Sequence, residues 1–304
     1  MNTPKSQSSV GVIGLGAMGN GMAQSVRRAG YSPFVFDVRA EAAQAFAKDG
    51  GTACATLAEL SKSCDVVVSV VVNAAQTESV LFGESGQGGC AASMKPGSVF
   101  VMCSTVDPNW SVALEARLAA LGILYIDAPI SGGAAKAASG QMTMMTAGKP
   151  EAYAIAEPIL NVMAAKVYKL GDSAGAGSKV KIINQLLAGV HIAAAAEAMA
   201  LGLREGVDPD ALYEVITNSA GNSWMFENRM AHVLAADYTP LSAVDIFVKD
   251  LGIVLDMARA TKFPLPLSST AHQMFMQAST AGFAKEDDSA VIKIFPGIEL
   301  PKKK

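Results

Sequence analysis

A chain of 304 residues is long enough for two domains and a sizeable buried core. Its composition is 51% hydrophobic and 17% charged, which excludes a disordered or fibrous protein. The net charge of -3, with 24 Lys plus Arg against 27 Asp plus Glu, argues against a nucleic-acid partner.

The N-terminal half alternates short β-rich runs with helical stretches. Several of these runs are apolar without alternation, as in strands that are covered on both faces. The pattern predicts an α/β fold with a doubly wound, mostly parallel sheet, and a surface loop at Gly83–Gly89. The expected strands are Val10–Ile13, Phe34–Phe36, Val66–Val72, Val99–Met102, Leu124–Ile126, Met142–Met145 and Val167–Tyr168, and the expected helices include Met18–Ala29, Pro108–Leu121 and Glu151–Met163.

After about Gly171 the strand signals stop, and Lys179–Glu205 predicts one helix about 40 Å long. Asn184, Gln185 and other polar residues inside it argue against a membrane span. We expect a Rossmann domain over residues 1–173 and an all-α domain over residues 174–304 that begins with this interdomain helix. Further helices are predicted near Asp208–Ser219, Ser223–Ala235, Leu241–Thr261 and Leu267–Thr280, with Asp208 as an N-cap and Pro209 at N1.

A G-x-G-x-x-G motif lies between the first predicted strand and helix. Gly14 permits a tight turn, Gly16 lets a pyrophosphate approach the backbone, and Gly19 allows the helix to pack closely on the strand. The helix N-terminus supplies free N–H groups and a partial positive charge for phosphates. A purely structural turn is the alternative. We predict a dinucleotide site that includes Gly14, Leu15, Gly16, Ala17, Met18 and Gly19.

The second predicted strand ends in Asp37, 18 residues after Gly19. A carboxylate at this place can bind the hydroxyls of the adenosine ribose and would repel a 2′-phosphate, which favours NAD over NADP. Arg39 could instead receive a 2′-phosphate, so NADP is the alternative cofactor.

At the start of the long helix, Lys181, Asn184 and Gln185 are spaced i, i+3 and i+4 and share one face. The helix N-terminus disfavours an ammonium and attracts a substrate carboxylate, while burial would lower the pKa of the lysine. Such a lysine can take a proton from an alcohol and return it. Alone, the segment is also compatible with exposed lysines on a first helical turn.

Three shorter motifs complete the set of candidate sites. Ser131 with the N–H groups of Gly132 and Gly133 can form a nest for a carboxylate, although an ordinary loop is the alternative. Ser104-Thr105 lies at the carboxyl end of a strand, where open α/β sheets bind ligands. Lys249-Asp250-Leu251 in the helical domain is the last candidate, with an exposed charged pair as the alternative.

These features, in this order over nearly the whole chain, resemble the β-hydroxyacid dehydrogenase family. Its motifs are matched at Gly11–Gly19, Ser104–Thr105, Asp127–Gly133 and Lys249–Leu251. The resemblance implies an oxidoreductase with a Rossmann domain that binds NAD, a small hydroxy acid as substrate, and a homodimer or homotetramer built through the helical domain.

The same resemblance assigns roles to individual residues. It makes Lys181 the general acid/base and places Thr105 near the nicotinamide ribose, with Lys249 closing over the cofactor. The cofactor loop usually has Leu-Pro where this chain has Val71 and Val72. The residues that it places at the substrate are Ser131, Gly132, Gly133, Lys181 and Gln185.

One position departs from the family pattern. The family usually has Lys-x-x-Asn-Asn, whereas this chain has Gln185 at the last place, which keeps an amide but extends about one methylene further. With Leu186–Ile192 and Asn222–Phe226, this resembles the branch that oxidises the C2 hydroxyl of L-threonate, a four-carbon sugar acid, to 2-dehydro-L-erythronate with NAD. Chemistry on 3-hydroxyisobutyrate or tartronate semialdehyde is the alternative, and a non-catalytic dinucleotide-binding regulator is the alternative of another class.

The four cysteines form no Cys-x-x-Cys pair and have no histidine at ligand spacing. We therefore expect neither a bound metal nor disulfides. The same cysteine usage favours a reducing, cytoplasmic location. The polar stretch Met1–Ser9 and the polar residues inside the long apolar helix predict a protein that does not enter a membrane.

Overall fold

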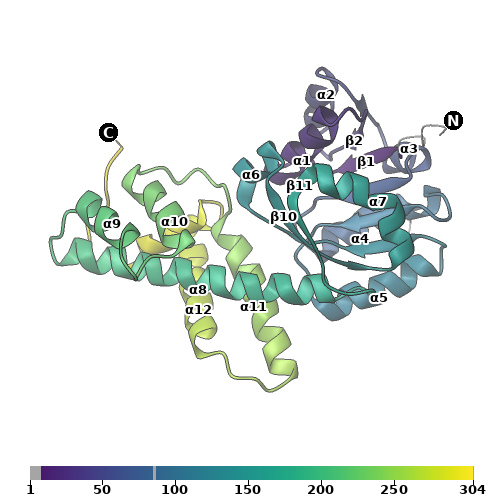
Figure 1. The fold of residues 1–304 in the computed structure, drawn as a ribbon. Helices are drawn as coiled ribbons and strands as arrows, with labels where there is room; N and C mark the ends of the chain where they lie inside the picture. Colours follow the sequence, from purple (N-terminus) through teal and green to yellow (C-terminus); the bar gives the residue numbers. More distant parts are fainter. Residues whose placement is uncertain (1–7, 85–86, 304) are drawn as a thin grey trace. The chain divides into compact units, whose positions relative to one another are not determined.

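The computed structural model describes residues 8–84 and 87–303 and divides into two compact units at the Lys181–Ile182 bond. Unit 1 holds a large sheet covered by helices, and unit 2 is built from helices (Figure 1). The first seven residues of the predicted Rossmann domain lie outside the described residues.

The sheet of unit 1 has the strand order β3-β2-β1-β4-β7-β8-β10-β11. The first six strands in this order are parallel to one another, β10 runs antiparallel to β8, and β11 runs parallel to β10. The first six follow the order of a doubly wound Rossmann sheet, which confirms the predicted fold class. The strands are β1 (Val10–Ile13), β2 (Phe34–Phe36), β3 (Thr52–Ala53), β4 (Val66–Ser69), β7 (Val99–Met102), β8 (Leu124–Asp127), β9 (Ile130–Ser131, paired with β10), β10 (Met142–Gly148) and β11 (Ala164–Lys169).

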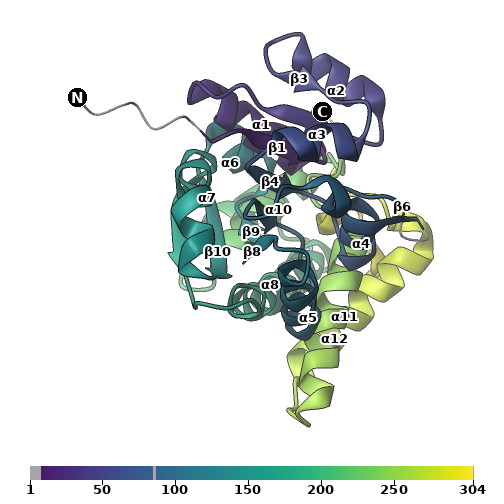
Figure 2. The same cartoon turned by 90° about the vertical axis from the view of Figure 1, so that its right-hand side faces the viewer.

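Helices cover both faces of this sheet, and Figure 2 shows α6 and α7 on one side and α4 and α5 on the other. Every residue of β1, β4 and β7 is buried, which explains their apolar sequences without alternation. Val66 and Val68 pack into one apolar layer and Val67 into the other. The first layer includes α1 (Ala17–Arg28), α2 (Ala40–Ala47), α6 (Gly133–Ser139) and α7 (Pro150–Met163), and the second includes α3 (Leu57–Ser63), α4 (Ala74–Phe82) and α5 (Pro108–Ala119).

Two predictions in this unit are wrong in detail. The strand predicted over Val66–Val72 ends at Ser69, because Asn73 caps α4 and accepts a hydrogen bond from the Gln76 N–H, which turns the chain out of the sheet. The surface loop predicted at Gly83–Gly89 instead contains two short antiparallel strands, β5 (Gly83–Glu84) and β6 (Gln87–Gly88). Residues 85–86 between them lie outside the described residues.

The long predicted helix is α8 (Ala176–Arg204), which starts in unit 1 and continues into unit 2. By length and composition it could cross a membrane, yet its fully buried residues, among them Ile192 and Met199, lie in the apolar core of unit 2, as in a core helix of a soluble protein. The Asp208 side chain accepts a hydrogen bond from the Ala211 N–H and caps the next helix, as predicted. The remaining α-helices described in unit 2 are α9 (Pro209–Thr217), α10 (Trp224–Leu234), α11 (Val244–Ala260) and α12 (Pro266–Ala278), followed by a π-helical turn at Ser279–Phe283 and a 3-10 helix at Asp288–Ile294.

Candidate cofactor site and active site

The glycines of the β1–α1 turn meet three different surroundings. Gly14 has φ +88°, and a Cβ there would lie 2.5 Å from the Val70 carbonyl oxygen. A Cβ on Gly19 would lie 1.8 Å from the Gly14 carbonyl oxygen, whereas a Cβ on Gly16 would meet nothing within 4 Å. Gly14 and Gly19 are therefore needed by the fold, while Gly16 leaves open space at the N-terminus of α1, where a pyrophosphate fits.

Gly16 is also the N-cap residue of α1, and the first turn of this helix has no side-chain cap and no acidic residue. Its N–H groups and the positive end of the helix dipole are thus available to an anionic ligand. The open space, the uncapped helix and the missing acidic residue all suit a dinucleotide.

Asp37 follows β2 and is nearly buried beside this turn. Its Oδ2 accepts a hydrogen bond from the Leu15 N–H at 2.7 Å, and its Oδ1 accepts from the Arg39 N–H at 2.9 Å. Burial alone would raise the pKa of Asp37, but these hydrogen bonds and the Arg39 guanidinium lower it overall. Asp37 is therefore a carboxylate at neutral pH and can accept hydrogen bonds from ribose hydroxyls.

Arg39 extends along this carboxylate, with its Nε 3.2 Å from Asp37 Oδ1. Its side chain is 65% exposed. Asp37, predicted to bind the ribose hydroxyls, and Arg39, the alternative site for a 2′-phosphate, thus form one ion pair rather than two separate sites.

The carboxyl ends of four parallel strands meet at one edge of the sheet. In the strand register Ile13 pairs with Ser69, Ser69 with Met102, and Met102 with Asp127. The segments that follow these residues hold the glycine turn, Val71 and Val72, Thr105, and the Ser131–Gly133 loop. The structure therefore brings the predicted cofactor and substrate segments of unit 1 to the same edge, beside the β1–β4 switch point where such sheets bind ligands.

Ser104 links two of these segments, a contact that the sequence analysis missed. Its Oγ donates a hydrogen bond to the Val71 carbonyl at 2.8 Å and lies 3.0 Å from Thr77 Oγ1. The Val72 N–H donates to Gln76 Oε1 at 2.8 Å. The loop is held through backbone groups, so valines can stand where the family usually has Leu-Pro.

The substrate loop joins β9 to α6. Gly132 and Gly133 have φ values of +138° and +74°, which favour glycine and turn the backbone sharply after Ser131. The α6 helix that follows packs on α1, since a Cβ on Gly21 would lie 2.6 Å from the backbone of Ala137. The loop is thus braced against the helix that begins at the glycine turn.

Asp127, the first residue of the substrate-loop motif, holds the start of α8. Its carboxylate accepts hydrogen bonds from the Gly175 N–H and the Ser178 N–H, both at 2.9 Å, and from Ser178 Oγ at 2.6 Å. Burial raises the pKa of Asp127, and these hydrogen bonds oppose that rise. The Asp127 carboxylate therefore lies at the helix N-terminus where we predicted that a substrate carboxylate is attracted, and that prediction stays open. The sequence indicated this contact only by placing an aspartate at the end of a predicted strand.

Lys181 is the last residue of unit 1 and is 7% exposed. It lies one helical turn after Ser178, so the two residues are on the same side of α8.

Gln185 and Asp250 join α8 to α11 inside unit 2. Gln185 Nε2 donates to Asp250 Oδ2 at 2.5 Å, and Asn184 Nδ2 donates to Gln185 Oε1 at 3.1 Å. Lys249 Nζ forms an ion pair with Asp250, which is 1% exposed. The alternative of an exposed Lys249-Asp250 pair is therefore wrong for Asp250, and Gln185 has a hydrogen-bond partner on α11.

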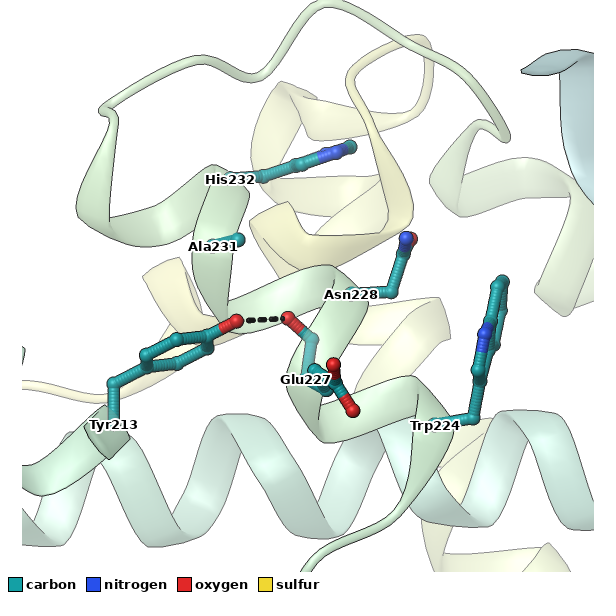
Figure 3. A pocket seen from close by; sticks show the side chains of 6 residues that line it. All are labelled: Tyr213, Trp224, Glu227, Asn228, Ala231 and His232. Carbon is teal, nitrogen blue, oxygen red and sulfur yellow. Dashed lines mark hydrogen bonds between the residues drawn. The ribbon is translucent and has the colours of Figure 1, made fainter. Parts of the chain in front are cut away.

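A pocket of about 310 Å³ lies on α9 and α10 of unit 2 (Figure 3). The predicted site residues do not line it. Its lining consists of Tyr213, Trp224, Glu227, Asn228, Ala231 and His232. The Tyr213 hydroxyl donates a hydrogen bond to the Glu227 carbonyl at 2.8 Å.

The four cysteines are buried, free thiols. Burial raises the pKa of Cys64, Cys90 and Cys103 to about 12, so these thiols are unreactive at neutral pH. Within residues 8–84 and 87–303, His, Cys, Asp and Glu side chains do not gather in groups of three that could hold a metal ion.

The Rossmann sheet, the glycine turn and the carboxylate of Asp37 beside it are the features of a dinucleotide-binding protein. Comparison with known proteins extends this. Residues 9–171 match the family of the NAD binding domain of 6-phosphogluconate dehydrogenase, and residues 175–295 match the family of the NAD-binding domain of NADP-dependent 3-hydroxyisobutyrate dehydrogenase.

Individual relatives are similar over nearly the whole chain. The L-threonate dehydrogenase of Cupriavidus necator is 68% identical over 97% of this chain and 98% of its own, and that of Escherichia coli K12 is 52% identical over 97% of both. A crystal structure of 3-hydroxyisobutyrate dehydrogenase from Salmonella typhimurium is 53% identical, covers 95% of this chain and all of that one, and has a TM-score of 0.90. The chain belongs to the β-hydroxyacid dehydrogenase family, and its cofactor is a nicotinamide dinucleotide.

Proposed function

We propose that the protein oxidises the C2 hydroxyl of L-threonate to 2-dehydro-L-erythronate with NAD, in the carbohydrate metabolism of the cytoplasm. Relatives that are 52–68% identical over nearly their full length carry the name L-threonate dehydrogenase. The observation that carries the chemistry is a buried lysine, Lys181, one turn after the helix start that is anchored to the substrate-loop strand.

The residues of this chain fit the cofactor as follows. The turn from Gly14 to Gly19 would hold the pyrophosphate, Asp37 would accept hydrogen bonds from the ribose hydroxyls, and Thr105 with the Val71–Val72 loop would serve the nicotinamide half. When bound, NAD supplies the acceptor for the hydride that leaves C2. Lys249 remains a prediction from the family resemblance.

The neutral amine of Lys181 takes the proton of the C2 hydroxyl. As the O–H and C2–H bonds break, the hydrogen of C2 leaves with its electron pair and the C–O bond becomes C=O, so one NADH and one proton form per acid oxidised. Ser131 and the N–H groups of Gly132 and Gly133 hold the substrate carboxylate. Asn184 and Gln185, on the same face of α8 as Lys181, orient the developing carbonyl or a neighbouring hydroxyl.

A panel of hydroxy acids tests this assignment. L-threonate, 3-hydroxyisobutyrate and tartronate semialdehyde are each assayed in the direction that their oxidation state allows, with NAD(H) and with NADP(H), by the absorbance of the reduced cofactor. We expect L-threonate with NAD to have the highest kcat/KM. A higher value for another acid would replace the substrate, and no turnover with any acid would favour a non-catalytic regulator.

We also propose that copies of the chain associate through the helical unit. Ile183, Leu187 and Leu201 lie on one face of α8 and are each more than half exposed. In a dimer, a second copy of the chain would remove this apolar stripe from water. Sedimentation of the wild type and of Leu187→Asp separates a dimer or tetramer, which the substitution should weaken, from a monomer, which it should leave unchanged.

A further inference from the structure

Asp127 connects three parts of unit 1 that are far apart in the sequence. It ends β8, it begins the loop to Ser131, and its buried carboxylate accepts three hydrogen bonds from Gly175 and Ser178. Two of these donors are backbone N–H groups at the start of α8, which need a partner because they have none within the helix. A single carboxylate thus fixes the start of α8 to the end of the substrate-loop strand.

Backbone packing reinforces this anchor. A Cβ on Gly177 would lie 2.4 Å from the Met145 carbonyl oxygen and 2.9 Å from that of Asp127, so the first turn of α8 rests directly on β8 and β10. Gly177 has no side chain, so its backbone contacts these carbonyl oxygens directly. Any change in how Asp127 holds the turn is therefore passed along the helix to Lys181, which is three residues from Ser178.

We infer that Asp127 is a positioning residue for Lys181, holding the amine at a fixed place relative to the Ser131–Gly133 loop. The inference rests on the proposed function and adds a residue through which the general base acts. Proton transfer needs heavy atoms within hydrogen-bond reach, and a misplacement of about 1 Å can cost on the order of a hundredfold in rate. Because Asp127 holds Ser178, only three residues before Lys181, a small shift of this contact would change the distance between the amine and the substrate hydroxyl.

Asp127→Asn is the variant that tests this inference. It keeps the size of the side chain but turns an NH₂ group toward the N–H donors of α8, which loosens the first turn. We expect kcat to fall by about tenfold or more, and the deuterium isotope effect on kcat/KM, with deuterium at the oxidised carbon, to rise because hydride transfer becomes more rate-limiting. The Kd for NADH should stay near the wild-type value.

Two comparisons separate positioning from a loss of folded protein. In a Lys181→Met background, Asp127→Asn should lower kcat no further, because the group through which Asp127 acts is already gone. Asp208→Asn is the matched control, since Asp208 also caps a helix, α9, which begins after the far end of α8. It should change neither kcat nor the isotope effect.

Amide hydrogen exchange gives a readout that does not depend on turnover. In Asp127→Asn the N–H groups of Gly175 and Ser178 should exchange faster, while those of the β1–α1 turn keep their rates. If Asp127→Asn fails to fold, Ser178→Ala removes only the Oγ contact and should show the same changes at smaller size.

The outcomes separate this inference from the proposed function. A wild type that oxidises none of the acids in the panel defeats the proposed function before any variant is made. An active wild type in which Asp127→Asn leaves the isotope effect unchanged, or costs the same factor with and without Lys181, overturns the positioning role alone. The substrate used is whichever acid the panel identifies, so a revised substrate leaves the test intact.

Discussion

The backbone N–H of Leu15 donates a hydrogen bond to the side chain of Asp37, 22 residues further along the chain, at 2.7 Å. This contact ties the glycine turn, the proposed phosphate site, to the carboxylate that we propose binds the ribose. The two halves of the cofactor site are therefore coupled, and a change at one of them should be felt at the other.

Removing the Asp37 side chain should weaken NAD binding more than NADP binding. In Asp37→Ala the ribose loses its acceptor and Arg39 loses its partner, so the guanidinium becomes available to a 2′-phosphate. We expect KM for NAD to rise by about tenfold or more, the value of one lost charge-assisted hydrogen bond, with a smaller change for NADP. The companion variant Arg39→Ala should spare NAD, and equal losses for both cofactors in Asp37→Ala would refute the ribose assignment.

Two glycines of the same turn should respond differently to alanine. Gly16→Ala places a methyl group in open space, so the melting temperature should stay close to that of the wild type while NADH affinity falls by at least about tenfold. Gly19→Ala drives a methyl group into the Gly14 carbonyl, and overpacking of this kind costs about 1–3 kcal/mol or more. Thermal unfolding and NADH fluorescence measure both effects. Unchanged NADH affinity in Gly16→Ala would place the pyrophosphate elsewhere.

Replacement of the proposed base should stop turnover without loss of the cofactor. Lys181→Met keeps an unbranched side chain in the same place, and kcat should fall by at least about a hundredfold, the lower end for a positioned acid/base. NADH binding should stay near normal. Lys179→Met, two residues earlier on the exposed side of α8, is the matched control and should retain its activity. Retained turnover in Lys181→Met would remove this lysine from the mechanism.

Shortening Gln185 should uncouple α8 from α11. Gln185→Asn restores the usual family pattern but draws the amide away from Asp250, whose buried carboxylate then loses a donor. We expect a loss of about 1–3 kcal/mol in the free energy of unfolding, together with a lower kcat/KM for L-threonate relative to the other acids. Denaturation by urea and the substrate panel measure the two effects. Full stability in this variant would show that the Gln185–Asp250 contact is dispensable.

Stability should fall with rising pH through one contact of unit 2. His232 Nδ1 lies 3.1 Å from Asp287 Oδ1, and this hydrogen bond raises the pKa of His232 above its ordinary 6.5. Burial would raise the pKa of Asp287, but hydrogen bonds from His232 and Ser289 lower it to about 2. The imidazolium–carboxylate contact is therefore fully present below about pH 6.5 and is lost as pH rises through the raised pKa of His232.

His232→Gln isolates this contribution. The wild type should exceed the variant by about 1 kcal/mol in the free energy of unfolding at pH 5, and the difference should shrink by pH 9. Burial raises the pKa of the neighbouring Asp288 to about 6 against the pull of Arg229, so both proteins carry its titration and the difference largely cancels it. A difference that does not change with pH would mean that His232 is neutral throughout.

The sequence predicted the sheet well because its strands are buried on both faces and therefore apolar at every position, as in Val66–Val68. It did not predict where β4 ends, since the apolar run continues to Val72 while a cap at Asn73 and the hydrogen bond from Ser104 set the turn. Local polar contacts set the end of β4, and the hydrophobicity pattern does not show such contacts.

The candidate site also has features that the sequence predicts and contacts that it does not. Glycine spacing and the strand-end Asp37 could be read directly, because each depends on residues close in the sequence. The contacts of Asp127 with Ser178 and of Gln185 with Asp250 join residues 51 and 65 positions apart, and one sequence holds no signal of such pairing. Both aspartates looked like members of short motifs, whereas their partners are on other elements.

One consequence of the unbroken α8 concerns insertions and deletions. Lys181 and the amides of Asn184 and Gln185 share one face of the helix only while the amides stand at positions i+3 and i+4 from the lysine. A single residue added between them would turn the amides by about 100° and move them about 1.5 Å. Point substitutions in this stretch can change which acid is accepted, whereas a change of length would move the amides away from the proposed base. Homologues should therefore differ here by amino-acid substitutions and not by insertions or deletions.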